Sequence, residues 1–333
     1  MRRPALLLAF ALLGALAASQ AYADGEGTVE GRVINGTRDG GSVAGLEVTL
    51  NAAVGDAAPL VAPTDAEGQF RFEALSAAGD GPYTLAVRYQ GVDYTAGGIE
   101  ISADNPSRQA ELTVYETTTS TETVKVLLDH HIVEASPQEH RLNIVNYIQL
   151  ANAGDRTVVA PQANPGQPPL FPLPEAAEKV ELLDGSSQHA SGGSTGLSLR
   201  SIPPGEHELV LAYELPYEGD SFVFRKPVNY PTEKAVFLLS AHDGRAVSQQ
   251  LPAVKEVESA AGMYRLLTGE NPPVGGVLEV TITDMLTESG NPLVDILRPA
   301  AAVLVLLAIG AVVVYVRFRR RRVLPSPQGD GNA

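Results

Sequence analysis

The chain has 333 residues, with 24 basic and 39 acidic side chains and a net charge of −15 at pH 7. It contains no cysteine, which excludes disulfide bonds, thiolate metal sites, attached c-type haem and a lipid-modified cysteine. An acidic chain repels nucleic acid, so we expect no nucleic-acid partner. The length is enough for about two ordinary domains.

The first 23 residues have the pattern of a cleaved signal peptide. Arg2 and Arg3 precede an apolar run over residues 5–18, and the Ala-Tyr-Ala segment 21–23 places small residues before the cleavage point. The run is shorter than the ~20 residues that a membrane span needs, which disfavours an uncleaved anchor. We therefore predict export by ordinary secretion, with the mature chain beginning near Asp24.

From residue 24 to 116 apolar and polar side chains mostly alternate, which is the pattern of half-buried strands. Turns rich in glycine and asparagine separate the runs, as at Asn35-Gly36. Many short strands at this spacing predict a small antiparallel β-sandwich. The alternating positions are Val29/Gly31/Val33, Leu46/Val48/Leu50, Phe70/Phe72, Tyr83/Leu85/Val87/Tyr89, Ile99/Ile101 and Leu112/Val114.

Four runs in this region resemble the carboxypeptidase regulatory-like domain. They are residues 31–37 (GRVINGT), 43–50 (VAGLEVTL), 64–72 (TDAEGQFRF) and 83–87 (YTLAV). The resemblance implies a transthyretin-like sandwich of the carbohydrate-binding-like class. It also implies an accessory or spacer module without catalytic residues, and a role in carbohydrate binding would rest on the name of the fold alone.

The polar segment 117–123 is predicted to be a linker, or else the end of a strand that enters the next domain. Alternation then resumes over residues 124–286 without a long amphipathic helix, which predicts a second, larger β-sandwich of immunoglobulin-like or related Greek-key type. Residues 162–174 and 185–196 are expected to be surface excursions. The alternating positions are Val124/Val126/Leu128, Leu142/Ile144, Ile148/Leu150, Leu209/Leu211/Tyr213, Phe222/Phe224, Val236/Leu238 and Leu278/Val280/Ile282.

The C-terminal segment has the pattern of a single membrane span. Residues 287–297 form a juxtamembrane linker, and residues 298–316 are apolar over a length that suits a transmembrane helix apart from Arg298 at their start. The tail, 317–333, begins with a block of arginines, which keeps its side of the membrane in the cytoplasm. We therefore predict a protein of the cell membrane with its N-terminus outside the cytoplasm.

All six histidines lie in the second domain. His131 and Glu134 have the H-x-x-E spacing of some zinc ligands, and His242 is a candidate third ligand. Residues three apart on a strand point to opposite faces, and the region lacks the α/β scaffold of metallocarboxypeptidases. A metal-dependent hydrolase is therefore a disfavoured alternative.

Other chemistry-bearing groups are assigned ordinary structural roles. Copper or nickel binding by three histidines is a minor alternative, and we expect one of the neighbours His130 and His131 to be buried and the other exposed. Two acidic turns are expected to be solvated rather than calcium sites, a glycine-rich stretch is expected to be a flexible loop, and four aromatic residues are expected in the core rather than in a partner-binding patch. The three histidines are His130, His140 and His207, and the two acidic turns are Asp65/Glu67 and Glu218/Asp220. The glycine-rich stretch is Gly192–Gly196, and the four aromatic residues are Phe171, Tyr213, Tyr217 and Tyr230.

Taken together, the sequence predicts an all-β, non-enzymatic protein that is anchored in a bacterial cell envelope and displays two sandwiches to a protein or glycan partner. We assign no catalytic, cofactor-binding or metal residues and no cofactor. An accessory subunit of a membrane complex is the first alternative, and the hydrolase centred on His131, Glu134 and His242 is the second.

Overall fold

The computed structural model describes residues 26–53, 58–76, 81–160, 170–183, 190–193, 196–259 and 262–285, which form strands, turns and loops. The all-β prediction is confirmed for this part of the chain. The predicted signal peptide, juxtamembrane linker, membrane span and tail lie outside the described residues. Within the described ranges, no helix is long and apolar enough to cross a membrane. The described residues divide into two compact units, with boundaries at residues 34/35, 41/42 and 113/114: the first comprises the described residues up to 34 and 42–113, and the second comprises 35–41 and those from 114 onward.

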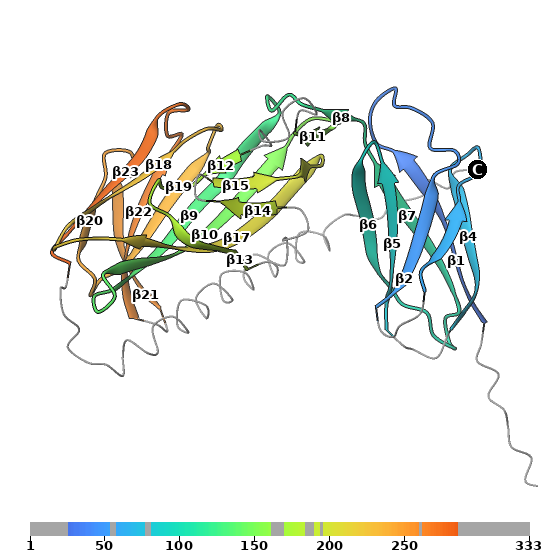
Figure 1. Ribbon diagram of the computed structural model, residues 1–333, viewed down its shortest axis with the longest axis horizontal. Coiled ribbons are helices and arrows are strands. Elements are labelled where there is room, and N and C mark those ends of the chain that lie inside the picture. Colours follow the sequence, from blue (N-terminus) through green and yellow to red (C-terminus); the bar gives the residue numbers. More distant parts are fainter. Residues whose placement is uncertain are drawn as a thin grey trace, which may run out of the picture. The chain divides into compact units, whose positions relative to one another are not determined.

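The first unit is a sandwich of two sheets, with strand orders β4-β1-β7 and β3-β2-β5-β6 (Figure 1). Its interior holds the predicted alternating side chains, among them Val29, Val33, Leu50 and Phe72. Strand β3 has no alternating signal and was not predicted. The bounds are β1 (Glu26–Asn35), β2 (Glu47–Ala52), β3 (Leu60–Pro63), β4 (Gln69–Ser76), β5 (Tyr83–Tyr89), β6 (Val92–Ile99) and β7 (Ser107–Val114).

Gly31 occupies an apolar position of β1 because the neighbouring groups leave no room for a side chain. A Cβ atom there would lie 2.3 Å from the carbonyl oxygen of Ala110 and 2.4 Å from the ring of Phe70. We expect Gly31→Val to destabilise the first unit by about 1–3 kcal/mol through overpacking. Far-UV circular dichroism during heating measures this as a lower unfolding midpoint.

The matched control is Gly97→Ala in β6, where the nearest side-chain atom would lie 3.4 Å from the new Cβ. This variant is expected to unfold within a few degrees of the parent. Equal midpoints for Gly31→Val and the parent would contradict the packing argument.

The second unit contains a seven-stranded sheet of order β13-β17-β10-β9-β19-β22-β21 (Figure 1). Its pairs are antiparallel except β9 with β19, which run parallel. The bounds are β9 (Val124–Ser136), β10 (Arg141–Asn152), β13 (Glu178–Leu182), β17 (Gly205–Pro216), β19 (Lys234–Ser240), β21 (Ala253–Ser259) and β22 (Gly262–Glu270).

Three smaller sheets, of orders β18-β23-β20, β12-β15-β14 and β16-β11-β8, pack against one face of the large sheet. One hydrophobic cluster joins them, with Phe224 and Val280 from one side and Ile144 and Leu211 from the other. The predicted larger sandwich is thus present. The bounds are β8 (Thr117–Thr118), β11 (Thr157–Val159), β12 (Leu170–Pro172), β14 (Ala190–Gly193), β15 (Gly196–Leu199), β16 (Ser201–Ile202), β18 (Phe222–Pro227), β20 (Arg245–Val247) and β23 (Val277–Thr283).

Three details differ from the sequence-based expectations. Thr117–Thr118 do not belong to an unpaired linker, because they form β8 and pair in parallel with β11. Gly192 and Gly196 are paired residues of the β14–β15 hairpin rather than parts of a flexible loop. Leu128 does not share the core face with Val124 and Val126, since a bulge in the β9–β10 pairing shifts the alternation after Val126.

Candidate binding surfaces and a buried polar cluster

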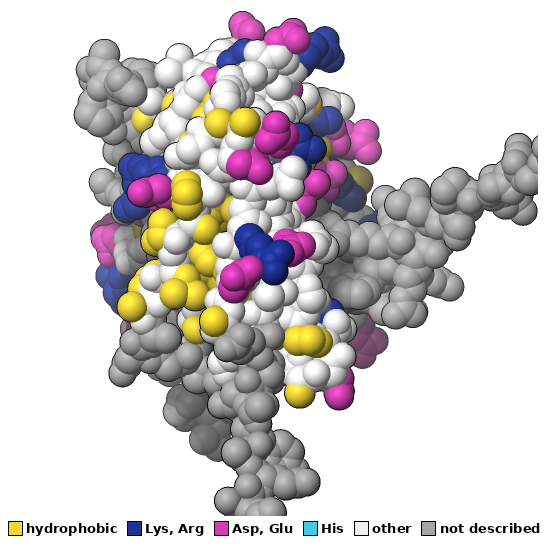
Figure 2. All heavy atoms as spheres, turned by 90° about the vertical axis from the view of Figure 1, so that its right-hand side faces the viewer, with side chains coloured by type: hydrophobic (Ala, Val, Ile, Leu, Met, Phe, Trp, Pro, Cys, Tyr) yellow, Lys and Arg dark blue, Asp and Glu magenta, His cyan; other side chains and the backbone are white. Residues whose placement is uncertain are grey.

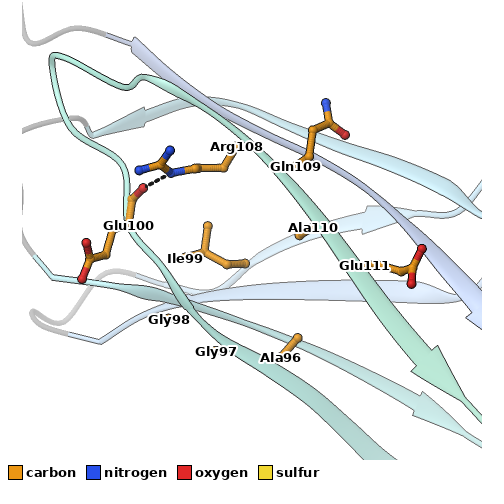
Figure 3. Close-up of a pocket in the computed structure, with 9 residues that line it drawn as sticks. All are labelled: Ala96, Gly97, Gly98, Ile99, Glu100, Arg108, Gln109, Ala110 and Glu111. Atoms are coloured by element: carbon orange, nitrogen blue, oxygen red, sulfur yellow. Dashed lines mark hydrogen bonds between the residues drawn. The ribbon is translucent and has the colours of Figure 1, made fainter. Parts of the chain in front are cut away.

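A groove of about 430 Å³ runs between β6 and β7, the edge strands of the two sheets of the first unit. Figure 3 shows Ile99 pointing between the strands, while Gly97 and Gly98 leave the backbone of β6 uncovered. Arg108 Nε donates a hydrogen bond of 2.5 Å to the carbonyl oxygen of Glu100. Edge backbone and polar side chains make this groove unlike the enclosed apolar pockets that bind small molecules.

Strand β3 lies at the edge opposite β6 in the β3-β2-β5-β6 sheet. It exposes two large hydrophobic side chains, Leu60 and Val61. Figure 2 shows a face of the molecule on which hydrophobic side chains gather in one area, while acidic and basic side chains are intermixed elsewhere. Two neighbouring residues form a small patch, and scattered exposed apolar residues are normal on soluble domains.

The outer face of the β18-β23-β20 sheet carries a row of exposed valines. Val223 and Val247 both pair with Thr281, which places the three side chains side by side across the sheet. Val223 is 40% exposed, Val247 62% and Val277, further along β23, 43%. Val223 and Val247 thus form a small exposed apolar patch, and Glu279 separates Val277 from it along β23.

A hollow of about 440 Å³ adjoins this row where β20 ends. Beyond that point the side chains of Ser248 and Gln250 take over the pairing with β23, because they donate to the carbonyl oxygens of Glu279 (2.6 Å) and Val277 (3.0 Å). Glu279 also forms an exposed ion pair with Arg225 at 3.0 Å. The surface therefore combines apolar side chains with a polar rim, as protein interfaces do.

The interior of the second unit holds a cluster of polar side chains. Lys226, on β18, is 5% exposed, and its Nζ lies 2.6 Å from Oδ2 of Asp129 on β9. The other carboxylate oxygen of Asp129 accepts a hydrogen bond of 2.9 Å from Nδ2 of Asn146 on β10. Nε2 of His131 lies 3.2 Å from that same oxygen. Asp129 thus links a lysine from one sheet with an amide and an imidazole from the other.

Aromatic rings enclose this cluster. The His131 ring lies 5.0 Å from that of Phe224 and 6.3 Å from that of Phe237, measured between centroids. The Tyr213 hydroxyl lies 3.5 Å from Nδ1 of His131. Charged groups in such surroundings interact strongly, because the local dielectric constant is low.

Burial and neighbouring charges shift the acid–base equilibria of the cluster. Burial by itself raises the pKa of Asp129, but the Lys226 ammonium and His131 outweigh it and hold the pKa well below its usual range. Burial lowers the pKa of His131 although Asp129 opposes the shift. Burial also raises the pKa of Tyr213, which keeps its hydroxyl protonated. The lowered pKa keeps the Asp129 carboxylate ionised at neutral pH, opposite the Lys226 side chain.

The structure does not bring together the three residues of the hydrolase alternative. His131 points into the core, whereas Glu134 accepts a hydrogen bond of 2.9 Å from Tyr264, a member of the cluster on the other face of the sheet. Their opposite orientation agrees with the strand geometry. His242 is exposed in the turn after β19.

The remaining histidines are also separate. His130 is half-buried rather than exposed, on the other face from His131, and burial together with the nearby His131 lowers its pKa to about 4. His140 is exposed in the β9–β10 turn, and His207 Nε2 lies 2.7 Å from the carbonyl oxygen of Pro203. Among the described residues, no three histidine or acidic side chains are grouped as a metal site.

The turn and aromatic candidates have structural roles. Oδ1 of Asp65 accepts the backbone N–H groups of Glu67 (3.0 Å) and Gln69 (2.7 Å), which closes the β3–β4 turn. Phe171 and Tyr230 stack at 4.7 Å between ring centroids. All four aromatic candidates are buried, as expected for core residues: Phe171, Tyr213, Tyr217 and Tyr230.

The sequence analysis missed Lys226, Asp129 and Asn146, although two of them carried a signal. Asn146 lies two residues from each of the core residues Ile144 and Ile148, and Lys226 lies two residues from the core residue Phe224. Strand alternation therefore places both polar side chains on the core face. A polar residue at a core position of an alternating strand requires a buried partner. Asp129 carried no such signal, because the bulge in β9 breaks the alternation before it.

The described residues thus form two β-sandwich units. Residues 28–122 match the model of the carboxypeptidase regulatory-like domain. This part of the chain is therefore similar to that domain, as the resemblance predicted. No curated protein matches the chain.

Several solved structures share limited similarity with the chain. A DUF3823 family protein from Parabacteroides merdae is 13% identical, with 56% of this chain and 80% of that chain covered and a TM-score of 0.22. BcpA, the major pilin subunit of Bacillus cereus, is 10% identical, with 78% and 96% covered and a TM-score of 0.19. Scores at this level support no conclusion about function.

Proposed function

We propose that this protein is a non-enzymatic scaffold of a bacterial cell membrane, which displays its two sandwiches outside the cytoplasm and binds a partner protein. The observation that carries the proposal is the valine row Val223, Val247 and Val277 on the outer face of the β18-β23-β20 sheet. Burying these side chains against a partner removes apolar surface from water, which favours association.

The predicted topology supports this placement. The apolar sequence over 298–316 and the arginines that follow it support a location of the folded units on the non-cytoplasmic side. The carboxypeptidase regulatory-like match supports an accessory role for the first unit. The acidic charge of the chain favours a partner with a basic contact surface.

The test begins with detergent extraction of the tagged full-length chain from its native membrane, followed by mass spectrometry of co-purifying proteins and metal analysis of the same sample. We expect a defined partner protein and no stoichiometric metal. Stoichiometric zinc that is lost in His131→Ala would instead support the hydrolase alternative. A chain that binds glycan but no protein would overturn the choice of partner.

The contact surface is tested with the double variant Val223→Glu/Val247→Glu. We expect at least a tenfold loss of recovered partner, because two carboxylates would be desolvated against an apolar contact. The control is Val61→Glu in β3 of the first unit, which should leave recovery unchanged; Val61 is 58% exposed, close to the 62% of Val247. If the partner is retained by the double variant but lost when the span is exchanged for another apolar helix, the protein is an accessory subunit that assembles through its span.

A further inference from the structure

The buried contact between Lys226, Asp129 and Asn146 has an unusual composition for a sandwich interior. Moving an ammonium and a carboxylate out of water costs several kcal/mol for each ion, and well-packed hydrophobic residues often stabilise a core as well or better. The carboxylate is also shared, because one oxygen contacts the amine of Lys226 (2.6 Å) and the other accepts from the carboxamide of Asn146 (2.9 Å). An amine and an amide are thus held on one acid–base group.

We propose that Lys226 and Asn146 form an intramolecular amide bond that joins the two sheets of the second unit, with Asp129 as the proton carrier. The reacting groups come from facing layers, since Lys226 lies on β18 and Asn146 on β10 of the large sheet. The bond would replace a buried ion pair with a neutral amide.

The reaction needs no reagent from outside the chain. Asp129 accepts a proton from the Lys226 ammonium, and the freed amine attacks Cγ of Asn146. Asp129 then protonates Nδ2 of Asn146 as the Cγ–Nδ2 bond breaks and ammonia leaves. Nζ, now bonded to Cγ, gives its extra proton to the same carboxylate, which passes it to the ammonia and is left ionised. Overall, an ammonium group and a carboxamide give a secondary amide and an ammonium ion, so atoms and charges balance.

Three features of the site suit this chemistry. The three side chains of the reaction are buried or nearly so, which excludes water as a competing nucleophile. Nδ2, the leaving group, already donates to the proton carrier. The third feature is His131, whose Nε2 lies 3.2 Å from the carboxylate oxygen of Asp129 that accepts from Nδ2.

The test is a tryptic peptide map of the purified full-length chain. Cleavage after Arg141 and Arg156 releases residues 142–156, which contain Asn146, and cleavage after Arg225 and Lys234 releases residues 226–234, which contain Lys226. We expect these two peptides to be joined, with a mass below their sum by about 17 Da, the mass of ammonia. Recovery of both peptides unlinked would overturn the proposal.

The same map separates the other possible partner of Lys226. Asp129 lies in the tryptic peptide 126–141, so a bond to Asp129 would join 226–234 to that peptide with loss of about 18 Da, the mass of water. That result would overturn the assignment to Asn146.

Two variants test the roles of the residues. Asp129→Asn keeps the amine and the amide but removes the proton carrier, and Lys226→Arg keeps the charge but removes the amine, so both should yield unlinked peptides. A link between 142–156 and 226–234 in Asp129→Asn would overturn the role of Asp129. The peptide map of the unaltered chain shows whether the bond between Lys226 and Asn146 is present, even if a variant fails to fold.

Discussion

Replacing Lys226 by methionine is expected to lower the free energy of unfolding of the second unit by about 3–5 kcal/mol, the cost of breaking a buried ion pair at one partner. Methionine has a similar length and no charge, so Asp129 would remain in the core without its ammonium contact at 2.6 Å. The loss is expected whether Lys226 is ion-paired or bonded to Asn146, because the substitution removes either link.

Urea unfolding of the detergent-solubilised chain, followed by far-UV circular dichroism, measures this loss. The matched control is Lys255→Met on β21, where the lysine is exposed, and it should change the free energy of unfolding by less than about 0.5 kcal/mol. A loss below about 1 kcal/mol for Lys226→Met would show that the core tolerates an unpaired Asp129 and would contradict the prediction.

Acidification is expected to destabilise the second unit between pH 6.5 and about 4, the ordinary and lowered pKa values of His130. In this window the unfolded chain binds a proton at His130 that the folded chain does not. The contribution of neutral His130 to the free energy of unfolding is therefore fully present above pH 6.5. It decreases as the pH falls, by up to about 1.4 kcal/mol per pH unit for each such histidine.

His131 contributes in the same direction, because burial lowers its pKa as well. Asp129 contributes differently, because its pKa is lower in the folded chain than the ordinary value of 3.8. The ionised carboxylate therefore stabilises the fold above pH 3.8, and this contribution is lost only as the pH falls below that value. The loss above pH 4 thus comes from the histidines, and the loss at lower pH includes the carboxylate.

The measurement is the urea midpoint of the parent and of His130→Gln at several pH values from 7 to 4. The variant should show a shallower dependence on pH, because glutamine does not titrate. His242→Gln, which changes an exposed histidine, should keep the slope of the parent. Equal slopes for the parent and His130→Gln would contradict the assignment of the titration to His130.

The proposed amide bond would matter for the stability of a chain without cysteine. Without cysteine, no disulfide bond restrains the folded chain. A bond between residues 146 and 226 would close a long loop, and closing long loops restrains the unfolded chain most. It would also keep the β18 strand, which carries Val223 of the valine row, fixed to the large sheet, because Lys226 belongs to the same strand.

Sequence alone determined the all-β fold class and the similarity of the first unit to the carboxypeptidase regulatory-like domain. Alternation in runs such as Leu142/Ile144 and Leu278/Val280/Ile282 reports which side chains share a face, and that information is local to each strand. The match over residues 28–122 agrees with the turn and strand motifs. The same strand geometry correctly placed His131 and Glu134 on opposite faces.

Only the tertiary structure decided which strands meet. Strands β9 and β19 pair in parallel although about a hundred residues separate them. Strand β19 is buried on both faces, so its sequence does not show which side chains face the core between the sheets. The bulge in β9 turned Asp129 inward, and sheet order brought it to Lys226 on the facing layer. Such contacts depend on strand pairing between distant segments and on packing of one sheet on another, neither of which a local periodicity encodes.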